Sequence, residues 1–416
     1  HHTPDETLPS ALAILNPKRR DNRYPFTELS GCGVAFKLVQ GLAQHRGLPF
    51  ETLLPLLELL VLSIAQDRVS ILGENRIFTY HGLQQINTRP SVAITYLMRL
   101  GKIQPGRVDM ASIYYELGPR INAAGRMAHG AESVKLLIAE DHETAEAQSQ
   151  ILDDYNRQRQ DLDQLVTRQA IELIEQEQDL LQHPILILYR PEWNKGVMGI
   201  VAARLADRYH RPVIILSRSG NFLAGSGRSS GGFDLYQAIQ SCSDCLENFG
   251  GHIFAAGLTI REDRLEEFRS RMEAYAAGAE HGPQRITPVL TIDAELRPSD
   301  ISRALLRQIE LLYPFGTDNE RPLFLVRGMR DAGGSRPVGK AQQHLSLRMT
   351  DSYQRIRPIH GFALGLARYA PDITRHCAFA LCFELEENNF YPQSFLQLRV
   401  KDLCLESELA ERLEDK

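Results

Sequence analysis

Two arginines, an asparagine and two glycines crowd into the nine positions from Gly118 to Arg126, which read Gly-Pro-Arg-Ile-Asn-Ala-Ala-Gly-Arg. Glycine lets a backbone come close to a ligand, and a guanidinium fork binds an anion through several N–H groups. The composition therefore predicts a loop whose backbone approaches an anion while Arg120 and Arg126 clamp it. The alternative is a helix cap whose arginines are merely solvated.

A second stretch places two glycines directly before a histidine. It reads Phe-Gly-Gly-His at 249–252, and Ala-Ala-Gly follows at 255–257. An imidazole beside a closely approached backbone serves as a hydrogen-bond donor, a base or a metal ligand. The pattern predicts a ligand contact at His252, with an ordinary Gly-Gly turn and a packed histidine as the alternative.

Together the two stretches resemble the motifs of one family. "LGPRINAAGRM" and "FGGHIFAAGLTI" are similar to motifs of the DHH phosphoesterase superfamily, in its RecJ-type single-strand DNA exonuclease branch. The resemblance covers nearly the whole chain, because further matches follow in the family's order at Leu8 to Leu38, Asn194 to Ser217, Gly225 to Leu235 and Leu312 to Phe324, the last being similar to the start of an OB-fold.

The resemblance implies a site for Mn²⁺ or Mg²⁺, with two ions in the complete protein. Paired divalent ions activate a water and neutralise the charge that develops on a phosphodiester, and oxygen ligands with imidazole suit these metals. His1 and His2 match catalytic, metal-binding histidines of the Asp-His-His motif, and Asp67 matches a metal-ligating aspartate. Gln66 and Arg68 depart from the family's pattern, and an arginine beside the aspartate would compete with the ion.

The chain begins at His1 without a methionine, and this start falls inside the family's Asp-His-His motif. We therefore expect a fragment that lacks the first part of its catalytic domain, binds metal poorly and cleaves nothing by itself. The alternative is that His1 and His2 remain from a purification tag.

The resemblance also implies a set of phosphate contacts. Arg120 and His252 match catalytic residues, the first as a phosphate clamp beside the metals and the second as a contact from the next domain. Substrate-binding residues are implied at Asn122, Arg126, Gly225, Ser226, Arg228, Ser229, Gly250 and Gly251. A loop of small residues with hydroxyls, main-chain N–H groups and one arginine suits a nucleic-acid phosphate. Asn194 stands where the family usually has histidine.

Composition limits the function classes further. The formal net charge of −5 gives no whole-molecule basic signature, so nucleic-acid binding would need a local basic groove. No apolar run reaches the ~20 residues of a membrane span, and we expect a cytoplasmic protein without a membrane partner. The six cysteines are spread thinly, and the lone Cys242-x-x-Cys245 pair favours reduced, buried thiols over a zinc site.

The elements expected along the chain indicate an α/β fold: two α/β domains joined by a long helix and followed by a β-barrel OB-fold. A stretch without glycine or proline, with apolar residues at helical spacing, predicts the connecting helix. A β-α-β pattern predicts the second α/β domain, and short alternating strands predict the barrel. The expected boundaries are 1–139 for the C-terminal part of a DHH catalytic domain, 140–182 for the helix, 183–284 for a DHH-associated substrate-binding domain and 285–416 for the OB-fold.

Three functions remain open on the sequence. The first, implied by the resemblance, is 5′→3′ hydrolysis of single-stranded DNA in recombination and repair, with a single-strand-binding protein or a repair helicase as protein partner. The second is a catalytically degenerate binding or scaffold subunit, which Gln66, Arg68 and Asn194 favour. The third is a short-oligonucleotide phosphodiesterase, against which the appended barrel argues because such relatives lack one.

Overall fold

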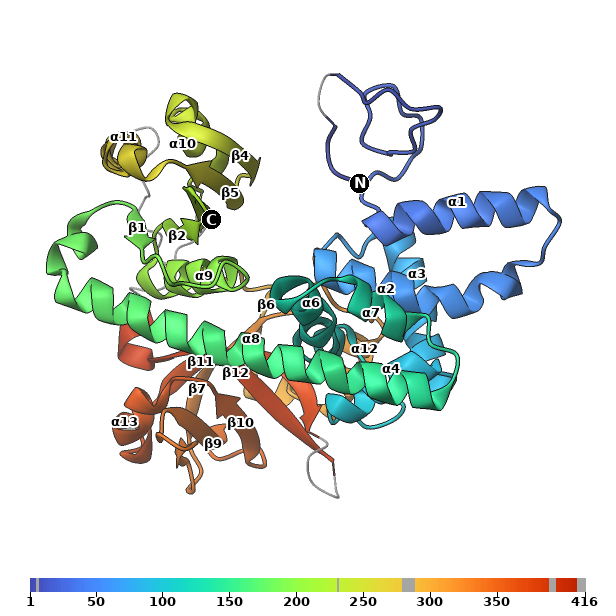
Figure 1. Ribbon diagram of the computed structural model, residues 1–416. Coiled ribbons are helices and arrows are strands. Elements are labelled where there is room, and N and C mark those ends of the chain that lie inside the picture. Colours follow the sequence, from blue (N-terminus) through green and yellow to red (C-terminus); the bar gives the residue numbers. More distant parts are fainter. Residues whose placement is uncertain (5–6, 230–231, 279–288, 389–393, 410–416) are drawn as a thin grey trace. The chain divides into compact units, whose positions relative to one another are not determined.

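The computed structural model describes residues 1–4, 7–229, 232–278, 289–388 and 394–409 (Figure 1). The chain divides into two compact units, His1–Gln85 with Leu290–Lys416, and Ile86–Val289. Helices and sheets are both present, so the predicted α/β class is confirmed. Within the described ranges, no helix has the length and apolar character needed to cross a membrane.

The first unit begins with helices packed on one another. They are α1 (Gly31–His45), the short 3₁₀ helix η1 (Phe50–Leu56), α2 (Leu57–Asp67) and α3 (Gly73–Thr88). The side chain of Ser30 caps α1 by accepting a hydrogen bond from Gly33 N, and Phe36 of α1 packs edge-on against Phe78 of α3. Among the described residues before Leu186 there is no strand, so this region supplies helices alone to the α/β fold.

A β-barrel completes the first unit. Strands β7, β11, β12, β10 and β9 pair in that order, and β7 also pairs with β9, which closes the ring. Phe379, Phe383 and Met329 fill its core. The first strand of this sheet pairs with β7 from Ala294 onward. The elements are β6 (Ala294–Leu296), α12 (Arg303–Glu310), β7 (Phe324–Asp331), β8 (Arg336–Val338), β9 (His344–Asp351), β10 (Ile359–Ala363), α13 (Ala370–Thr374), β11 (Phe379–Asn388) and β12 (Phe395–Leu405).

The second unit opens with helices gathered along one long helix. The long helix, α8, runs for 35 residues from His142 to Gln176, and the side chain of Asp141 caps its start. At 1.5 Å per residue it spans about 52 Å. This confirms the helix predicted within 140–182, although it ends six residues earlier. Packed near it are α4 (Val92–Leu100), α5 (Met110–Ser112), η2 (Ile113–Leu117), α6 (Gly118–Met127) and α7 (Ala131–Leu137).

A five-stranded sheet forms the rest of the second unit. Its order is β1-β2-β3-β5-β4, with β1 and β2 parallel and the other pairs antiparallel. The predicted β-α-β unit is β1 (Leu186–Tyr189), α9 (Met198–Tyr209) and β2 (Val213–Ser219). The remaining elements are β3 (Phe222–Arg228), α10 (Leu235–Gln240), β4 (Leu246–His252), β5 (Ala255–Ile260) and α11 (Leu265–Ala277).

The two faces of this sheet are covered differently. Side chains of α9, such as Val201 and Leu205, pack with Leu188 and Ile215 on one face. Side chains of α10 and α11 pack on the other face, where Phe268 is fully buried. Helix α9 contacts β2 and β3. Part of the α9 face, on β3, β5 and β4, is therefore not covered by α9. The residues of these strands that point to this face are the ones that a ligand could contact.

Candidate functional site

The segment from Gly118 to Met127 is helix α6, so the predicted anion-binding loop is wrong. Pro119 lies in the first turn, where a missing N–H costs no hydrogen bond, and the small side chains of Ala123 and Ala124 are fully buried. Both small residues let α6 pack closely against α8, which it contacts extensively. The arginines are thus displayed on a helix, and their neighbours decide what each can bind.

Arg120 is occupied by acceptors within the protein. Its Nε donates to Asp153 Oδ1 at 3.0 Å, its Nη1 to the carbonyl of Glu116 at 2.6 Å and its Nη2 to the carbonyl of Leu100 at 3.0 Å. Its side chain is only 14% exposed. The guanidinium joins α6 to α4 and α8, so it positions the helix and offers little to an external phosphate.

Arg126, in the last turn of α6, differs from Arg120 both in its hydrogen bonds and in its exposure to solvent. It is exposed, and its Nη1 donates a 3.3 Å hydrogen bond to the carbonyl of Gly196. Gly196 permits this approach, since a Cβ there would lie 2.4 Å from the Arg126 carbonyl oxygen. Surrounding protein atoms nevertheless desolvate the guanidinium and lower its pKa. Asn122 lies four residues earlier, on the same face of α6.

Arg228, at the end of β3, lies close to the first turn of α9. Its Nη1 donates to Ser226 Oγ at 3.3 Å and to the Gly227 carbonyl at 2.7 Å. A Cβ on Gly199 would come within 2.8 Å of Arg228 Nη2 and 3.0 Å of Ser226 Oγ, so glycine gives the helix start its proximity to both. Desolvation, and then the positive charge of Arg126, lower the pKa of Arg228. The two guanidinium groups therefore lie near each other.

We call Arg126, Arg228, Ser226 and the first turn of α9 the arginine site. Within the described part of the chain, neither arginine forms an ion pair with a carboxylate. Two neighbouring positive charges without a carboxylate partner among the described residues, beside the positive end of a helix, would attract an anion. Hydroxyl and guanidinium donors at this place match the oxygens of a phosphate.

Sequence reasoning missed three residues that shape this site. Gly196 and Gly199 bring the strand-to-helix turn against the arginines, and a Gly-x-x-Gly spacing at a helix start was the signal that could have identified them. Arg159, on α8, is the third. Burial lowers its pKa, Arg126 and Arg120 add to that lowering, and its Nε is buried without a hydrogen-bond partner.

The sheet face next to the arginine site is lined by small residues. His252 of β4 pairs with Ala255 of β5, which pairs with Arg228 of β3, so their side chains share the α9 face in one row. Gly250 and Gly257 form the row with Ser226, and a Cβ on Gly250 would meet nothing within 4 Å. His252 is exposed. We call this surface of β3, β5 and β4 the open face.

Three residues predicted to bind substrate do not lie on the open face with free donors but have structural roles. Gly225 faces the α10 and α11 side, where a Cβ would come within 2.9 Å of Leu258 and Leu216 side-chain atoms. Gly251 has φ +149°, and a Cβ there would meet the Ala255 carbonyl oxygen at 2.2 Å, so it serves the hairpin backbone. Ser229 Oγ donates to the carbonyls of Phe233 and Ile253. The predicted loop at 225–229 is in fact strand β3 through Arg228.

The residues predicted to bind metal lie together in the first unit. His1 Nε2 and Asp67 Oδ2 are 4.0 Å apart, and the rings of His1 and His2 have centroids 4.1 Å apart. Two ligands each about 2.1 Å from one ion lie up to about 4.2 Å apart, so His1 and Asp67 fit a shared divalent cation. Ser63 Oγ also donates to Asp67. Arg68 follows in the left-handed conformation that ends α2.

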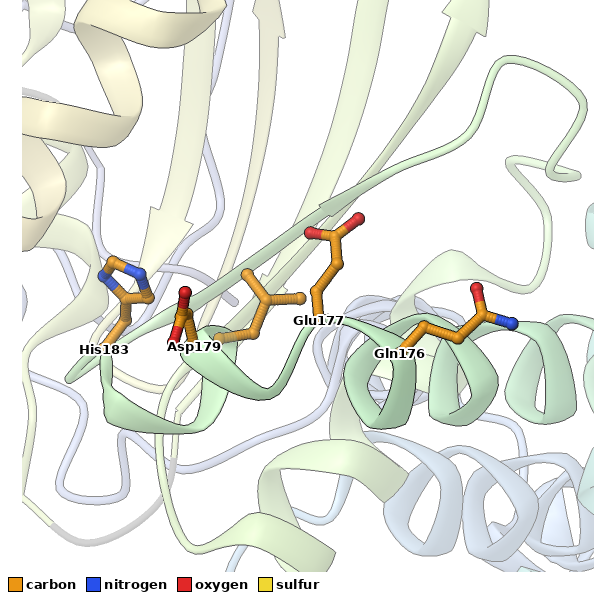
Figure 2. Close-up of a pocket in the computed structure, with 5 residues that line it drawn as sticks. Gln176, Glu177, Asp179 and His183 are labelled. Atoms are coloured by element: carbon orange, nitrogen blue, oxygen red, sulfur yellow. The ribbon is translucent and has the colours of Figure 1, made fainter.

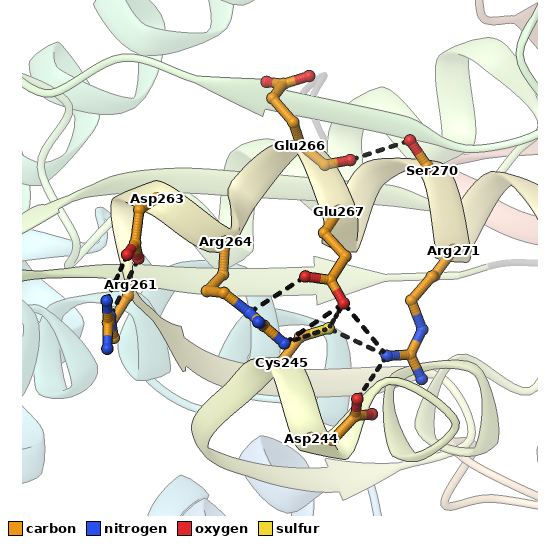
Figure 3. A network of polar contacts seen from close by, with 9 residues as sticks. All are labelled: Asp244, Cys245, Arg261, Asp263, Arg264, Glu266, Glu267, Ser270 and Arg271. Carbon is orange, nitrogen blue, oxygen red and sulfur yellow. Dashed lines mark hydrogen bonds and ion pairs between the residues drawn. The ribbon is translucent and has the colours of Figure 1, made fainter.

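A second group of residues has side chains of the kinds that bind metals, but its surroundings do not suit a cation. Asp244, Cys245 and Glu267 have ligand atoms within 4.8 Å of one another. Figure 3 shows Arg264 and Arg271 directed at them, with Arg271 Nη1 2.7 Å from Asp244 Oδ2 and 3.1 Å from Cys245 Sγ. The guanidinium groups already neutralise the carboxylates and would repel a cation. All six cysteines of the chain are free thiols.

A surface hollow of about 440 Å³ follows the end of α8. Figure 2 shows Gln176, Glu177, Asp179 and His183 along it, and Leu180 completes the lining. His183 Nδ1 is 3.1 Å from a carboxylate oxygen of Glu273. The carboxylates of Glu177 and Asp179 would repel a phosphate at this hollow.

Two family descriptions match the chain, the DHHA1 domain over residues 182–278 and the RecJ OB domain over residues 292–402. The single-stranded-DNA-specific exonuclease RecJ of Bacillus subtilis is 32% identical over 97% of this chain and 50% of that protein. The protein of the same name from Salmonella typhimurium is 31% identical over 97% of this chain and 72% of that protein. The chain thus spans about half the length of the first of these relatives.

Solved structures of RecJ proteins also match this chain. The crystal structure of RecJ in complex with Mn²⁺ from Thermus thermophilus matches with a TM-score of 0.81 and 28% identity, over 97% of this chain and 57% of that one. The Mg²⁺ complex from the same organism matches with a TM-score of 0.76 and 26% identity, over 95% of this chain and 57% of that one. The helical region, the five-stranded sheet and the barrel all fall within these matches.

Proposed function

Because this chain belongs to the RecJ family, we propose that the protein is a metal-dependent exonuclease that hydrolyses single-stranded DNA from its 5′ end. The chain spans about half of the Bacillus relative, so hydrolysis is proposed for the protein expressed from the complete reading frame. For the 416-residue chain itself we propose that the second unit binds the strand.

The observation that carries this proposal is the proximity of two desolvated guanidinium groups, Arg126 and Arg228, neither of which forms an ion pair with a carboxylate of the described residues. Each lowered pKa comes first from desolvation, which disfavours a bare positive charge. A phosphate between the two guanidinium groups replaces the lost hydration and cancels their mutual repulsion. Binding therefore stabilises an arrangement that is electrostatically unfavourable without an anion.

Each neighbouring residue has a role in this binding. Ser226 Oγ and the first turn of α9 add donors to the phosphate held by the two arginines. His252 lies two strands away in the same row, about 10 Å from Arg228 at the usual strand spacing, and contacts a neighbouring phosphate. Arg120 keeps α6, and hence Arg126, in place. The small residues of the open face leave room for a strand to lie across it.

His1, His2 and Asp67 would hold Mn²⁺ or Mg²⁺. When bound, such an ion lowers the pKa of a water and neutralises charge that develops on the scissile phosphate. The protein's own part is to orient these ligands: Ser63 donates to Asp67, and the Asn16 side chain donates to the His2 carbonyl at 2.9 Å.

The test compares two proteins on single-stranded DNA labelled at either end, with manganese present. The first is the 416-residue chain, and the second is the protein expressed from the complete reading frame. We expect both to bind DNA and the second to release mononucleotides from the 5′ end, with release lost in its Asp67→Ala variant. Binding by a folded complete protein without any cleavage would instead indicate a non-catalytic nucleic-acid-binding subunit.

A further inference from the structure

The hairpin that carries His252 has an unusual tip. Its strands β4 and β5 are joined by two residues, Ile253 and Phe254, which are 48% and 56% exposed. Two-residue hairpin turns favour asparagine, aspartate and glycine, because their common forms need positive φ. Among the described residues with positive φ, neither Ile253 nor Phe254 occurs. The needs of the turn therefore do not explain two large apolar residues here.

The backbone of the tip is held from outside the hairpin. Ser229 N donates to the Phe254 carbonyl at 3.1 Å, Ser229 Oγ to the Ile253 carbonyl at 3.1 Å, and Leu235 N to the Ile253 carbonyl at 3.0 Å. Neither apolar side chain belongs to the cores on the two sides of the sheet. The tip is thus a fixed support whose two side chains are presented to solvent, where each costs hydrophobic free energy.

The position of the tip relates it to the arginine site. Phe254 directly precedes Ala255, and Ala255 pairs with both Arg228 and His252. Paired residues lie about 5 Å apart, so the backbone of Phe254 lies within one or two residues of Arg228 and His252, which are proposed to bind phosphate. In a single strand each phosphate is followed by an unpaired base with an apolar π-face, and such faces stack on aromatic side chains.

We propose that Ile253 and Phe254 form a nucleobase platform, on which a base of the bound single strand stacks against Phe254 with Ile253 at its edge. This rests on the proposed binding of single-stranded DNA at the arginine site. The ligand is one unpaired base of any identity, since stacking requires only a π-face. The platform supplies affinity that does not depend on charge, and a base held in a duplex cannot reach it.

The test measures fluorescence anisotropy of the 416-residue chain with two internally labelled oligonucleotides. One is oligothymidylate, and the other has the same phosphates but abasic sugars. We expect Phe254→Ala to weaken binding of oligothymidylate about 5- to 100-fold and to leave binding of the abasic strand unchanged. Phe254→Trp restores the affinity. The salt dependence of binding stays the same in both variants, because no phosphate contact is lost.

Several outcomes would overturn the platform. Equal losses by Phe254→Ala on both strands, or no loss on either, would show that the ring contacts no base. The wild-type chain could also bind both strands with equal affinity, and Arg228→Ala could reduce that affinity. This result would contradict the nucleobase platform but would be consistent with the proposed function. A wild-type chain that binds neither strand at low salt would overturn both.

A second measurement does not depend on a variant that folds. A strand carrying 2-aminopurine should lose fluorescence when the wild-type chain binds it, because stacking on Phe254 quenches the base. Unchanged 2-aminopurine fluorescence at saturating protein, at every position along the strand, would contradict the platform.

Discussion

Two clusters of arginines in the second unit differ in what faces them. Arg264 and Arg271 lie against Asp244, Cys245 and Glu267 (Figure 3), with Arg264 Nε 3.2 Å from a Glu267 oxygen. Arg126 and Arg228 have no carboxylate partner among the residues that the structure describes. The first cluster raises the pKa of Arg271, whereas desolvation lowers the pKa of both arginines in the second.

This difference is the reason for proposing that Arg126 and Arg228 bind phosphate while Arg264 and Arg271 are structural. A guanidinium paired with carboxylates has its donors satisfied, and a phosphate would have to displace them. A desolvated guanidinium beside another positive charge gains from an added anion. Local composition alone does not distinguish the two, since Arg120 and Arg126 lie in one short helix and fall into different classes.

The largest effect on DNA binding should come from removing one of the two arginines that are proposed to bind phosphate. Arg228→Ala and Arg126→Ala should each weaken single-stranded DNA binding by the 416-residue chain about 10- to 100-fold, because each loses charge-assisted hydrogen bonds to phosphate. The slope of log affinity against log salt should fall by about one in each variant. Anisotropy titrations at several salt concentrations measure both quantities, and an unchanged salt slope would contradict the assignment.

The matched control is Arg271→Ala, which should change stability and not binding. Arg271 Nη2 donates to the Ser241 carbonyl at 2.6 Å and Nη1 contacts Asp244, so its loss should lower the free energy of unfolding by about 1 kcal/mol. Urea denaturation measures this change. If Arg271→Ala reduced DNA affinity as much as Arg228→Ala does, the distinction between the clusters would fail.

A smaller effect is expected from Gly199→Ala. The added Cβ would lie 2.8 Å from Arg228 Nη2 and 3.0 Å from Ser226 Oγ, so both side chains must shift. Because alanine favours helix more than glycine does, stability should hold while DNA affinity falls by less than in Arg228→Ala. Paired urea and anisotropy measurements separate the two quantities; reduced stability with unchanged affinity would place the close contact outside the binding site.

The smallest expected effect is a change in the stability deficit of Arg271→Ala at acid pH. The hydrogen bond from Arg271 lowers the pKa of Asp244 from its ordinary 3.8. A carboxyl with a lowered folded pKa adds stability above its unfolded pKa and loses it as pH falls through the folded value. The stability deficit of Arg271→Ala should therefore be constant from pH 7 to about 4 and shrink at lower pH. Urea denaturation midpoints of the wild-type and Arg271→Ala proteins across this pH range measure the deficit. A deficit that grew as the pH fell would contradict the prediction.

The elements that local patterns encode were predicted well. Apolar spacing located α8, the β1-α9-β2 unit and most barrel strands within a few residues, because these periodicities depend on neighbouring positions alone. The sequence predicts a loop at 225–229, where the structure has β3, and it predicts no strand at β4 or β5. Their glycines and serines suggest turns locally, and cross-strand pairing in the sheet overrides that preference.

For the candidate site, the sequence by itself determined which residue types are available: two arginines in one motif, an arginine in another and a histidine after two glycines. Tertiary structure decided what each faces. Arg120 donates to Asp153, 33 residues along the chain, while Arg126 donates to the Gly196 carbonyl, 70 residues along. A guanidinium binds whichever acceptor the fold brings near it, so long-range packing, which no local pattern encodes, decides which arginines are left able to bind a phosphate.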